Sequence, residues 1–291
     1  MQHSSPDGAT RLAAQNHNRA DAVSRRCLLA GALGLAAFAG GARAQEAGTT
    51  DFWGARPSDL PQDFIFGYGS LINEPSRTST SGRQVAAVPA RLSAGFGHVR
   101  GFVARAGARW GAGFTALGLR PPGDGEAPAT INGVVFPATA PEMAAFDRRE
   151  SGYVRVEVLP AFIEPAGWQG LPAAGRIWVY IPATRDGAAF RVPDAAFPVV
   201  QSYVDVVLEG CLAEGTDFTR ELIATTFDWS EFWLDDRPVP RRPWALTPQA
   251  GAIDRLLAAT APAAARFRDR AFPEVYAARH LLPQPVPEGA R

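Results

Sequence analysis

The chain has 291 residues, of which 46% are hydrophobic and 20% charged, and its formal net charge is zero. A chain of this length and composition can bury a good core as one large domain or two small ones, so we expect a soluble globular protein. The balanced charge excludes the strongly basic composition of many nucleic-acid-binding proteins.

The N-terminal stretch has the pattern of an export signal. Residues 24–29 read "SRRCLL", residues 30–41 form the apolar run "AGALGLAAFAGG", and small residues follow at Ala42 and Ala44. This order predicts a twin-arginine signal peptide over residues 1–44, with cleavage after Ala44. The apolar run is too short for a stable membrane anchor, so we expect the export machinery as a partner and a periplasmic or secreted location. The alternative is a buried alanine-rich helix.

Cleavage changes the charge and the cysteine content. The remaining chain has 24 basic and 27 acidic residues, which argues against a nucleic-acid partner. Cys27 is lost with the signal and Cys211 remains alone, so we expect no intrachain disulfide. We also expect no cofactor, because no ligand set for one is evident in the sequence.

After a linker at 45–60, short apolar runs separated by Gly, Pro and Asp indicate a β-rich region at 61–183. The runs lie at 64–68, 85–92, 98–105, 114–120, 131–136, 153–159 and 176–181. Their short connections favour the α+β class, with a small mixed sheet or β-barrel flanked by helices, over a doubly wound sheet.

Helical patterns are predicted at two places. Residues 139–150 begin with Thr139 and Glu142 at capping-box spacing and are expected to end at a C-cap glycine, Gly152. A helical extension covers 184–280, with helices from 196 onward, at 217–225, at 248–259 and at 262–271. Its loop at 228–244 is rich in Trp, Arg and Pro; the segment "DDRPVPRRP" within it either binds acidic groups or forms local Asp–Arg pairs. We expect a mobile tail at 281–291.

The sequence "FGYGSLI" at 66–72 places two glycines around a tyrosine directly after a predicted strand. It lacks the third glycine of a dinucleotide-binding loop, and the chain lacks the lysine of a phosphate-binding P-loop. Gly67 and Gly69 carry no side chain and permit positive φ, so their exposed amides are expected to form an anion-binding nest; the alternative is a plain turn.

Ser70 is a poor candidate for a nucleophile. The pattern G-x-S-x-G would need glycines at positions 68 and 72, and His98 and His280 are the only histidines outside the predicted signal. Two histidines and one cysteine are also too few for an ordinary zinc site, so we expect no metal; the alternative is an ion site made of carboxylates alone.

Glu150 is the candidate acid or base. Met143, Phe146 and Glu150 are spaced i, i+3, i+7 and therefore share one helix face, while Arg149 is expected to point elsewhere. A carboxylate on an apolar face is either desolvated, so that its pKa rises as suits a general acid/base, or paired with an arginine such as Arg155. The sequence pattern leaves both open.

"FGYGSLI" together with "FDRRESGYVRVEV" (146–158) resembles the γ-glutamylcyclotransferase superfamily, including its glutathione-specific ChaC-like branch; the resemblance covers residues 61–183. It implies that the turn binds the γ-glutamyl group and that Glu150 is the acid/base. The turn residues are Gly67, Tyr68, Gly69, Ser70, Leu71 and Ile72.

The implied reaction needs neither an enzyme nucleophile nor a metal. The α-amine of a γ-glutamyl compound attacks its own γ-amide carbonyl, which releases 5-oxoproline and a free amine or peptide. The rival functions are a γ-glutamyl amide hydrolase or transferase on the same fold, and a periplasmic γ-glutamyl-binding protein without turnover. Export leaves glutathione, other γ-glutamyl peptides and γ-glutamyl amines as candidate substrates.

Overall fold

The computed structural model describes residues 62–109, 112–183, 190–238 and 248–282, all within one compact unit, Ala47–Arg291. The predicted signal at 1–44 and linker at 45–60 lie outside the described residues. So do residues 239–244 of the predicted Trp/Arg loop and residues 283–291 of the predicted tail.

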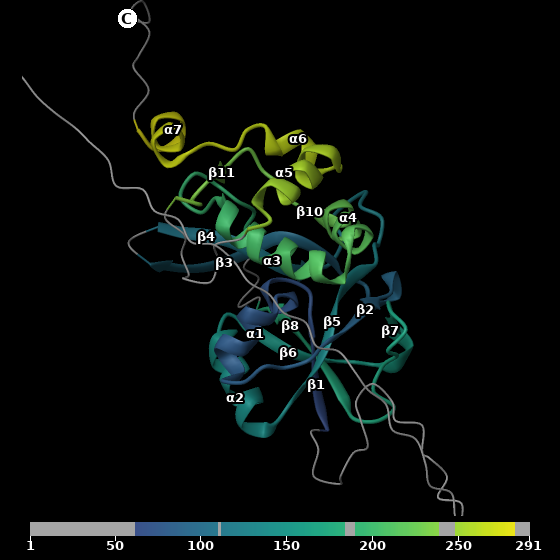
Figure 1. Ribbon diagram of the computed structural model, residues 1–291. Helices are drawn as coiled ribbons and strands as arrows, with labels where there is room; N and C mark the ends of the chain where they lie inside the picture. The colour runs from purple at the N-terminus through teal and green to yellow at the C-terminus, as the bar shows by residue number, and fades with distance from the viewer. Residues whose placement is uncertain (1–61, 110–111, 184–189, 239–247, 283–291) are drawn as a thin grey trace, which may run out of the picture. The chain divides into compact units, whose positions relative to one another are not determined.

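The largest sheet of the described chain has six strands and is called the central sheet below; it lies in the lower half of Figure 1. In spatial order its strands are β6 (Tyr153–Val158), β8 (Arg176–Pro182), β1 (Asp63–Gly67), β5 (Ile131–Ala138), β2 (Val88–Leu92) and β7 (Ile163–Pro165). Only β1 and β8 run parallel; the other neighbours are antiparallel. The predicted α+β class is confirmed. Within the described residues the sheet stays open, with β6 and β7 as its edges, rather than closing into a barrel.

A long hairpin packs beside this sheet. It consists of β3 (Val99–Arg109) and β4 (Ala112–Arg120), and β10 (Thr226–Phe227) adds a third, parallel strand to it. A small parallel pair, β9 (Val199–Val200) and β11 (Trp233–Leu234), lies in the C-terminal part of the chain.

Helices flank the sheets, and α1 and α2 lie together beside the six-stranded one (Figure 1). The helices are α1 (Glu74–Ser81), α2 (Ala140–Arg149), α3 (Gln201–Glu214), α4 (Thr216–Ala224), α5 (Ala250–Ala259), α6 (Ala263–Phe267) and α7 (Pro273–Tyr276). Short 3-10 turns occupy η1 (Ser70–Ile72), η2 (Ala94–Phe96) and η3 (Pro160–Phe162), and one π turn, η5, spans Ala277–Leu281. Helix α3 packs on η1, on α4 and on α5.

Helix α2 begins as predicted and ends differently. The side chain of Thr139 accepts from the amide of Glu142, and the Glu142 carboxylate accepts from the amide of Thr139, which confirms the capping box. The predicted C-cap glycine is wrong: Glu150 is the C-cap residue, and Gly152 does not have the positive φ of such a cap.

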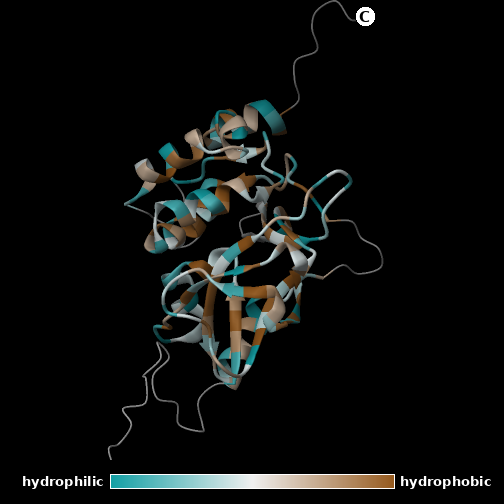
Figure 2. Cartoon of the chain, turned by 90° about the vertical axis from the view of Figure 1, so that its right-hand side faces the viewer, coloured by the Kyte–Doolittle hydropathy of each residue, from teal (hydrophilic) through white to brown (hydrophobic). Residues whose placement is uncertain are grey.

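The sheets and the C-terminal helices share one apolar core, which appears as brown bands along the strands and inward helix faces in Figure 2. Arg100 of β3 is fully buried at their junction, where its guanidinium donates to the carbonyls of Asn132 (2.7 Å) and Leu222 (3.1 Å). It thereby ties β5 to the end of α4. Cys211 is a buried free thiol on α3. No helix in the described ranges has the length and apolarity needed to cross a membrane.

Candidate active site

Strand directions bring three chain segments to one end of the central sheet. Because β1 and β8 are parallel and β6 is antiparallel to β8, the end of β1 lies beside the end of β8 and the start of β6. The turn after Gly67, the segment around Tyr180 and the loop between α2 and Tyr153 therefore meet.

The turn after β1 needs its glycines for close approach rather than for unusual backbone angles. Neither Gly67 nor Gly69 has positive φ, so the predicted nest geometry is wrong. A Cβ at Gly67 would lie 2.6 Å from Cβ of Leu71, and one at Gly69 would lie 3.1 Å from the hydroxyl of Tyr203. The chain can fold back over itself only where these side chains are missing.

Arg77 of α1 fixes this turn from behind. Its buried guanidinium donates to the carbonyls of Leu71 (3.0 Å) and Ile72 (2.6 Å). The helix that carries it is capped by Asn73, whose side chain accepts from the amide of Ser76. The turn and α1 thus form one rigid unit.

A cavity of about 730 Å³ opens in front of the turn. Of the residues predicted from the sequence, it is lined by Gly67, Tyr68, Gly69, Ser70, Leu71 and Glu150. Ile72 is not among the lining residues; its side chain is buried in the core. The structure therefore brings the predicted turn and the predicted carboxylate, which are eighty residues apart in the sequence, to one cavity.

The end of α2 fixes the position of Glu150, which is the C-cap residue of this helix. Its amide donates to the carbonyl of Phe146 (2.8 Å), and its carbonyl accepts from the amide of Tyr153 (2.8 Å), so the chain reverses tightly around it. Phe146 is fully buried, and the Glu150 side chain, which follows it on the same face, is 16% exposed. Burial raises the pKa of the Glu150 carboxyl above its ordinary value, and the neighbouring Arg149 opposes this shift.

Arg149 lines the cavity and does not point away as predicted. Its Nε lies 3.1 Å from Oε1 of Glu150, and its other nitrogens donate to the Ser70 hydroxyl (2.9 Å), to the Ser76 hydroxyl (2.8 Å) and to Thr80 (2.9 Å). The arginine that the sequence offered as a partner, Arg155, pairs instead with Asp147. Glu150 therefore has a cationic neighbour and is also desolvated, so both sequence alternatives hold in part.

Four tyrosines line the cavity, and three of them donate their hydroxyl protons to the protein. The acceptors are the Tyr180 carbonyl for Tyr68 (2.7 Å), the Leu117 carbonyl for Tyr153 (3.1 Å) and the Asp147 carboxylate for Tyr180 (2.7 Å). Burial raises the pKa of each of these phenols, and the negative charge of Glu150 contributes. All three therefore stay protonated near neutral pH.

Arg105 of β3 is a second guanidinium on the cavity wall. It pairs with Asp194 and stacks over the ring of Phe197, 3.9 Å from the ring centroid. The Asp194 carboxylate also accepts from the amides of Ala196 and Phe197. Arg105 is thus held in place by the segment that leads into β9.

The cavity does not contain the parts of a serine hydrolase. The Ser70 hydroxyl accepts from Arg149, and no histidine is among the cavity-lining residues described. Neither does the described part of the chain contain a group of three or more His, Cys, Asp or Glu side chains placed to hold a metal ion. The arrangement offers one buried carboxylate for proton transfer, and donors to bind a polar ligand.

Sequence reasoning missed several polar lining residues, among them Arg105, Arg149 and Tyr203. Helical periodicity placed Arg149 off the apolar face, but a long side chain at the last position of a helix can reach back across it. Arg105 and Tyr203 lie outside the two motifs, and nothing local in the sequence marks them.

Comparisons with known proteins give structural likeness alone. No family model matches the chain, and no curated protein matches it. A solved structure described as a γ-glutamyl cyclotransferase is 15% identical, with a TM-score of 0.39, and the match covers 65% of this chain and 96% of that one.

Two further solved structures are similar at the same level. A yeast γ-glutamyl cyclotransferase specific to glutathione is 18% identical, with a TM-score of 0.36, over 71% of this chain and 94% of that one. An uncharacterized protein from Homo sapiens is 16% identical, with a TM-score of 0.40, over 57% and 90%. Likeness at this level assigns no activity to this chain.

Proposed function

We propose that the chain is a γ-glutamyl cyclotransferase, which releases 5-oxoproline and a free amine or peptide from a γ-glutamyl compound. One observation carries the proposal: the Glu150 carboxylate and the turn at 67–71 line the same cavity. These are the two motifs on which the resemblance in the sequence rests. We further propose that the enzyme acts after export, in the periplasm or outside the cell.

Glu150 is suited to the proton transfers of this reaction. Burial raises the pKa of its carboxyl, which brings an acid/base group closer to neutral pH. In the proposed step the substrate's α-amine attacks the γ-carbonyl carbon and forms the ring C–N bond, while Glu150 takes a proton from that nitrogen. The original amide C–N bond then breaks, and Glu150 returns the proton to the leaving nitrogen.

The turn and the helix behind it are suited to orientation. An intramolecular attack depends on holding amine and carbonyl in the reactive geometry, and rigid walls favour this. Here Gly67 packs tightly under Leu71, and Arg77 fixes the carbonyls behind the turn. The cavity of about 730 Å³ leaves room beyond the γ-glutamyl group for an amine or peptide portion.

The test is to incubate the purified protein with a panel of γ-glutamyl peptides, including glutathione, and γ-glutamyl amines, and to follow the products by mass spectrometry. The proposal predicts 5-oxoproline and the free amine in equal amounts. Free glutamate in place of 5-oxoproline would assign hydrolysis to the same site. Calorimetric binding without product over hours would assign the non-catalytic alternative.

A further inference from the structure

Tyr203 differs from the other three tyrosines of the cavity. It lies on α3, in the C-terminal extension, and its hydroxyl oxygen accepts a hydrogen bond from the amide of Leu117 (3.1 Å). The other three hydroxyls donate to protein acceptors, whereas the described residues provide no acceptor for the Tyr203 proton.

A phenol hydroxyl has one proton to donate and lone pairs with which to accept. Since the oxygen of Tyr203 already accepts from a backbone amide, its own proton is available to a ligand in the cavity. Burial raises the pKa of Tyr203 above its ordinary value. The backbone amides of Leu117 and Ser70 and the charge of Arg149 oppose this shift only in part, so the group stays protonated near neutral pH.

We propose that Tyr203 donates a hydrogen bond to a substrate oxygen. We further propose that polar contacts between α3 and the rest of the C-terminal extension, called the frame below, hold Tyr203 in position. This inference rests on the proposed function, because the oxygen in question belongs to a γ-glutamyl compound. The receiving oxygen is either the γ-carbonyl or a carboxylate, and the kinetic test below separates the two.

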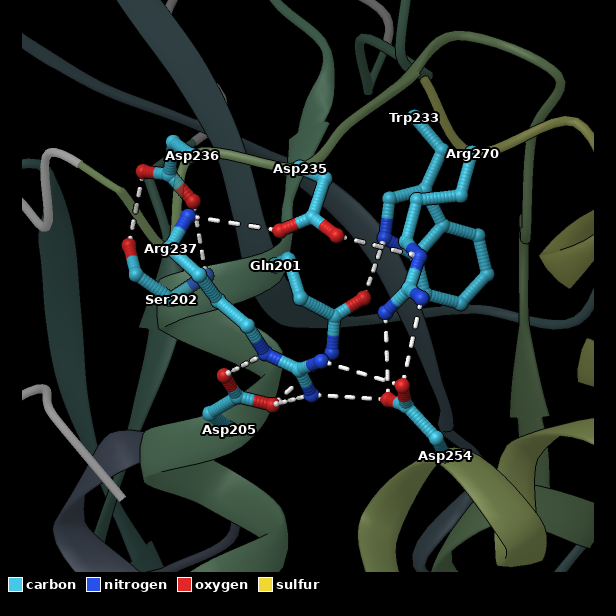
Figure 3. A network of polar contacts seen from close by, with 9 residues as sticks. All are labelled: Gln201, Ser202, Asp205, Trp233, Asp235, Asp236, Arg237, Asp254 and Arg270. Carbon is cyan, nitrogen blue, oxygen red and sulfur yellow. Dashed lines mark hydrogen bonds and ion pairs between the residues drawn. The ribbon is translucent and has the colours of Figure 1, made fainter. Parts of the chain in front are cut away.

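The frame begins at the N-terminus of α3, one residue from Tyr203. The N-cap position, Val200, has no side chain that can cap the helix. Asp236 takes that role from across the structure: its carboxylate accepts from the amide and from the hydroxyl of Ser202, both at 2.7 Å (Figure 3). Ser202 itself lines the cavity. A residue of the Trp/Arg loop therefore fixes the start of the helix at the cavity wall.

Arg237 extends the frame one turn further. Its guanidinium donates to Asp205 of α3 (2.7 and 2.8 Å) and to Asp254 of α5 (3.0 and 2.7 Å) (Figure 3). Asp254 is shared with Arg270, which also lies 3.4 Å from Asp235. The Asp205 side chain is 1% exposed, so this ion pair lies largely away from solvent on the α3 side.

The C-terminal half of α3 packs against the turn that follows β1. A Cβ at Gly210 would lie 2.6 Å from the amide nitrogen of Asn73, so the helix and turn backbones are in contact. The missing side chain of Gly69 likewise leaves room for the Tyr203 hydroxyl, because a Cβ at Gly69 would lie 3.1 Å from it. The ion pairs therefore fix one end of α3 and the turn fixes the other, with Tyr203 between them.

The first test compares Tyr203→Phe with Tyr276→Phe in the full chain. Tyr276 is a buried tyrosine of α7 whose hydroxyl donates to the Ala195 carbonyl (2.9 Å), and it does not line the cavity. We expect Tyr203→Phe to lower kcat/KM by roughly 10- to 100-fold and Tyr276→Phe to leave it unchanged.

The affected parameter identifies the oxygen. A fall in kcat at constant KM places the hydrogen bond on the γ-carbonyl, where negative charge develops in the transition state, and a rise in KM places it on a carboxylate. A Tyr203→Phe protein that folds and keeps kcat/KM within about twofold of wild type, less than a typical hydrogen bond contributes, overturns the inference.

The second test addresses the frame through Arg237→Gln. The control is Arg91→Gln, which breaks another bidentate pair, between β2 and Glu221 of α4, away from the cavity. We expect Arg237→Gln, unlike the control, to change the same kinetic parameter as Tyr203→Phe. In a Tyr203→Phe background its effect should largely vanish, because coupled residues are not additive. Equal effects in both backgrounds would show that Arg237 does not act through Tyr203.

A binding measurement separates this inference from the proposed function. If the wild type binds γ-glutamyl compounds without forming 5-oxoproline, calorimetry with Tyr203→Phe still tests the hydrogen bond, and weaker binding supports it. If the wild type forms 5-oxoproline and Tyr203→Phe does so equally well, the inference fails and the proposed function stands.

Discussion

Nε of Arg149 lies 3.1 Å from Oε1 of Glu150, and another nitrogen of the same guanidinium donates to the Ser70 hydroxyl at 2.9 Å. Adjacent residues at the end of α2 therefore join the candidate acid/base to the turn after β1. Two opposing influences act on Glu150: burial raises the pKa of its carboxyl, and Arg149 lowers it. Burial is the larger of the two influences.

Removing the arginine should raise the pKa of Glu150 further. We expect Arg149→Gln to move the acid limb of the profile of kcat/KM against pH to higher pH, because a base must be ionised to accept a proton. Arg148→Gln is the matched control, since Arg148 is the exposed neighbour on the same helix turn. A limb that stays in place or moves to lower pH in Arg149→Gln would show that Arg149 does not favour the ionised form of Glu150.

The same balance predicts a pH-dependent cost in stability. Because the pKa of Glu150 is higher in the folded than in the unfolded protein, the folded state disfavours its ionisation. Wild type should therefore lose stability relative to Glu150→Gln as pH rises from the unfolded glutamate pKa, about 4.3, through the folded value. Thermal unfolding of both proteins between pH 4 and 8 measures this. A constant difference in Tm across that range would contradict a raised pKa.

The close packing of the turn makes Gly67 intolerant of a side chain. A methyl group there would lie 2.6 Å from Cβ of Leu71, so we expect Gly67→Ala to destabilise the fold by about 1–3 kcal/mol. It should also lower activity, because the turn lines the cavity. Gly251→Ala on α5 is the control: its nearest neighbour would be the end of a flexible arginine at 3.7 Å, and its Tm should hold or rise. Equal Tm values for Gly67→Ala and wild type would show that the turn can relax.

Ser70 should tolerate loss of its hydroxyl better than a nucleophile would. The hydroxyl accepts one of several hydrogen bonds from Arg149, so we expect Ser70→Ala to lower kcat by less than about tenfold. Loss of a serine nucleophile costs about a millionfold. Intact-protein mass spectrometry during turnover provides the second readout, and a γ-glutamyl adduct that disappears in Ser70→Ala would contradict the assignment.

Local sequence patterns predicted much of the fold. Seven apolar runs correspond to the strands β1 to β6 and β8, because short apolar segments between glycines and prolines are strongly constrained. The capping box of α2 was equally readable. Helix α1 was missed, since its sequence "EPSRTSTS" has no apolar stripe; it is held by the Asn73 cap and by tertiary contacts.

The candidate site was predictable only where a motif marks it. Glu150 and the turn were identified, but the role of the glycines was not, because their necessity comes from Leu71 and from Tyr203 on a distant helix. Tyr203 itself lies 86 residues from Leu117, its hydrogen-bond partner. No local pattern in one sequence encodes such a contact.

The central claim is that Glu150 performs the proton transfers of 5-oxoproline formation. Its most direct test is 5-oxoproline release by wild type, Glu150→Gln and Glu157→Gln on whichever γ-glutamyl compound the wild type converts. Glu157 is an exposed glutamate on β6 and serves as the control. We predict that Glu150→Gln folds and loses at least about 100-fold in kcat, while Glu157→Gln keeps wild-type activity. A folded Glu150→Gln protein that releases 5-oxoproline at the wild-type rate would contradict the account.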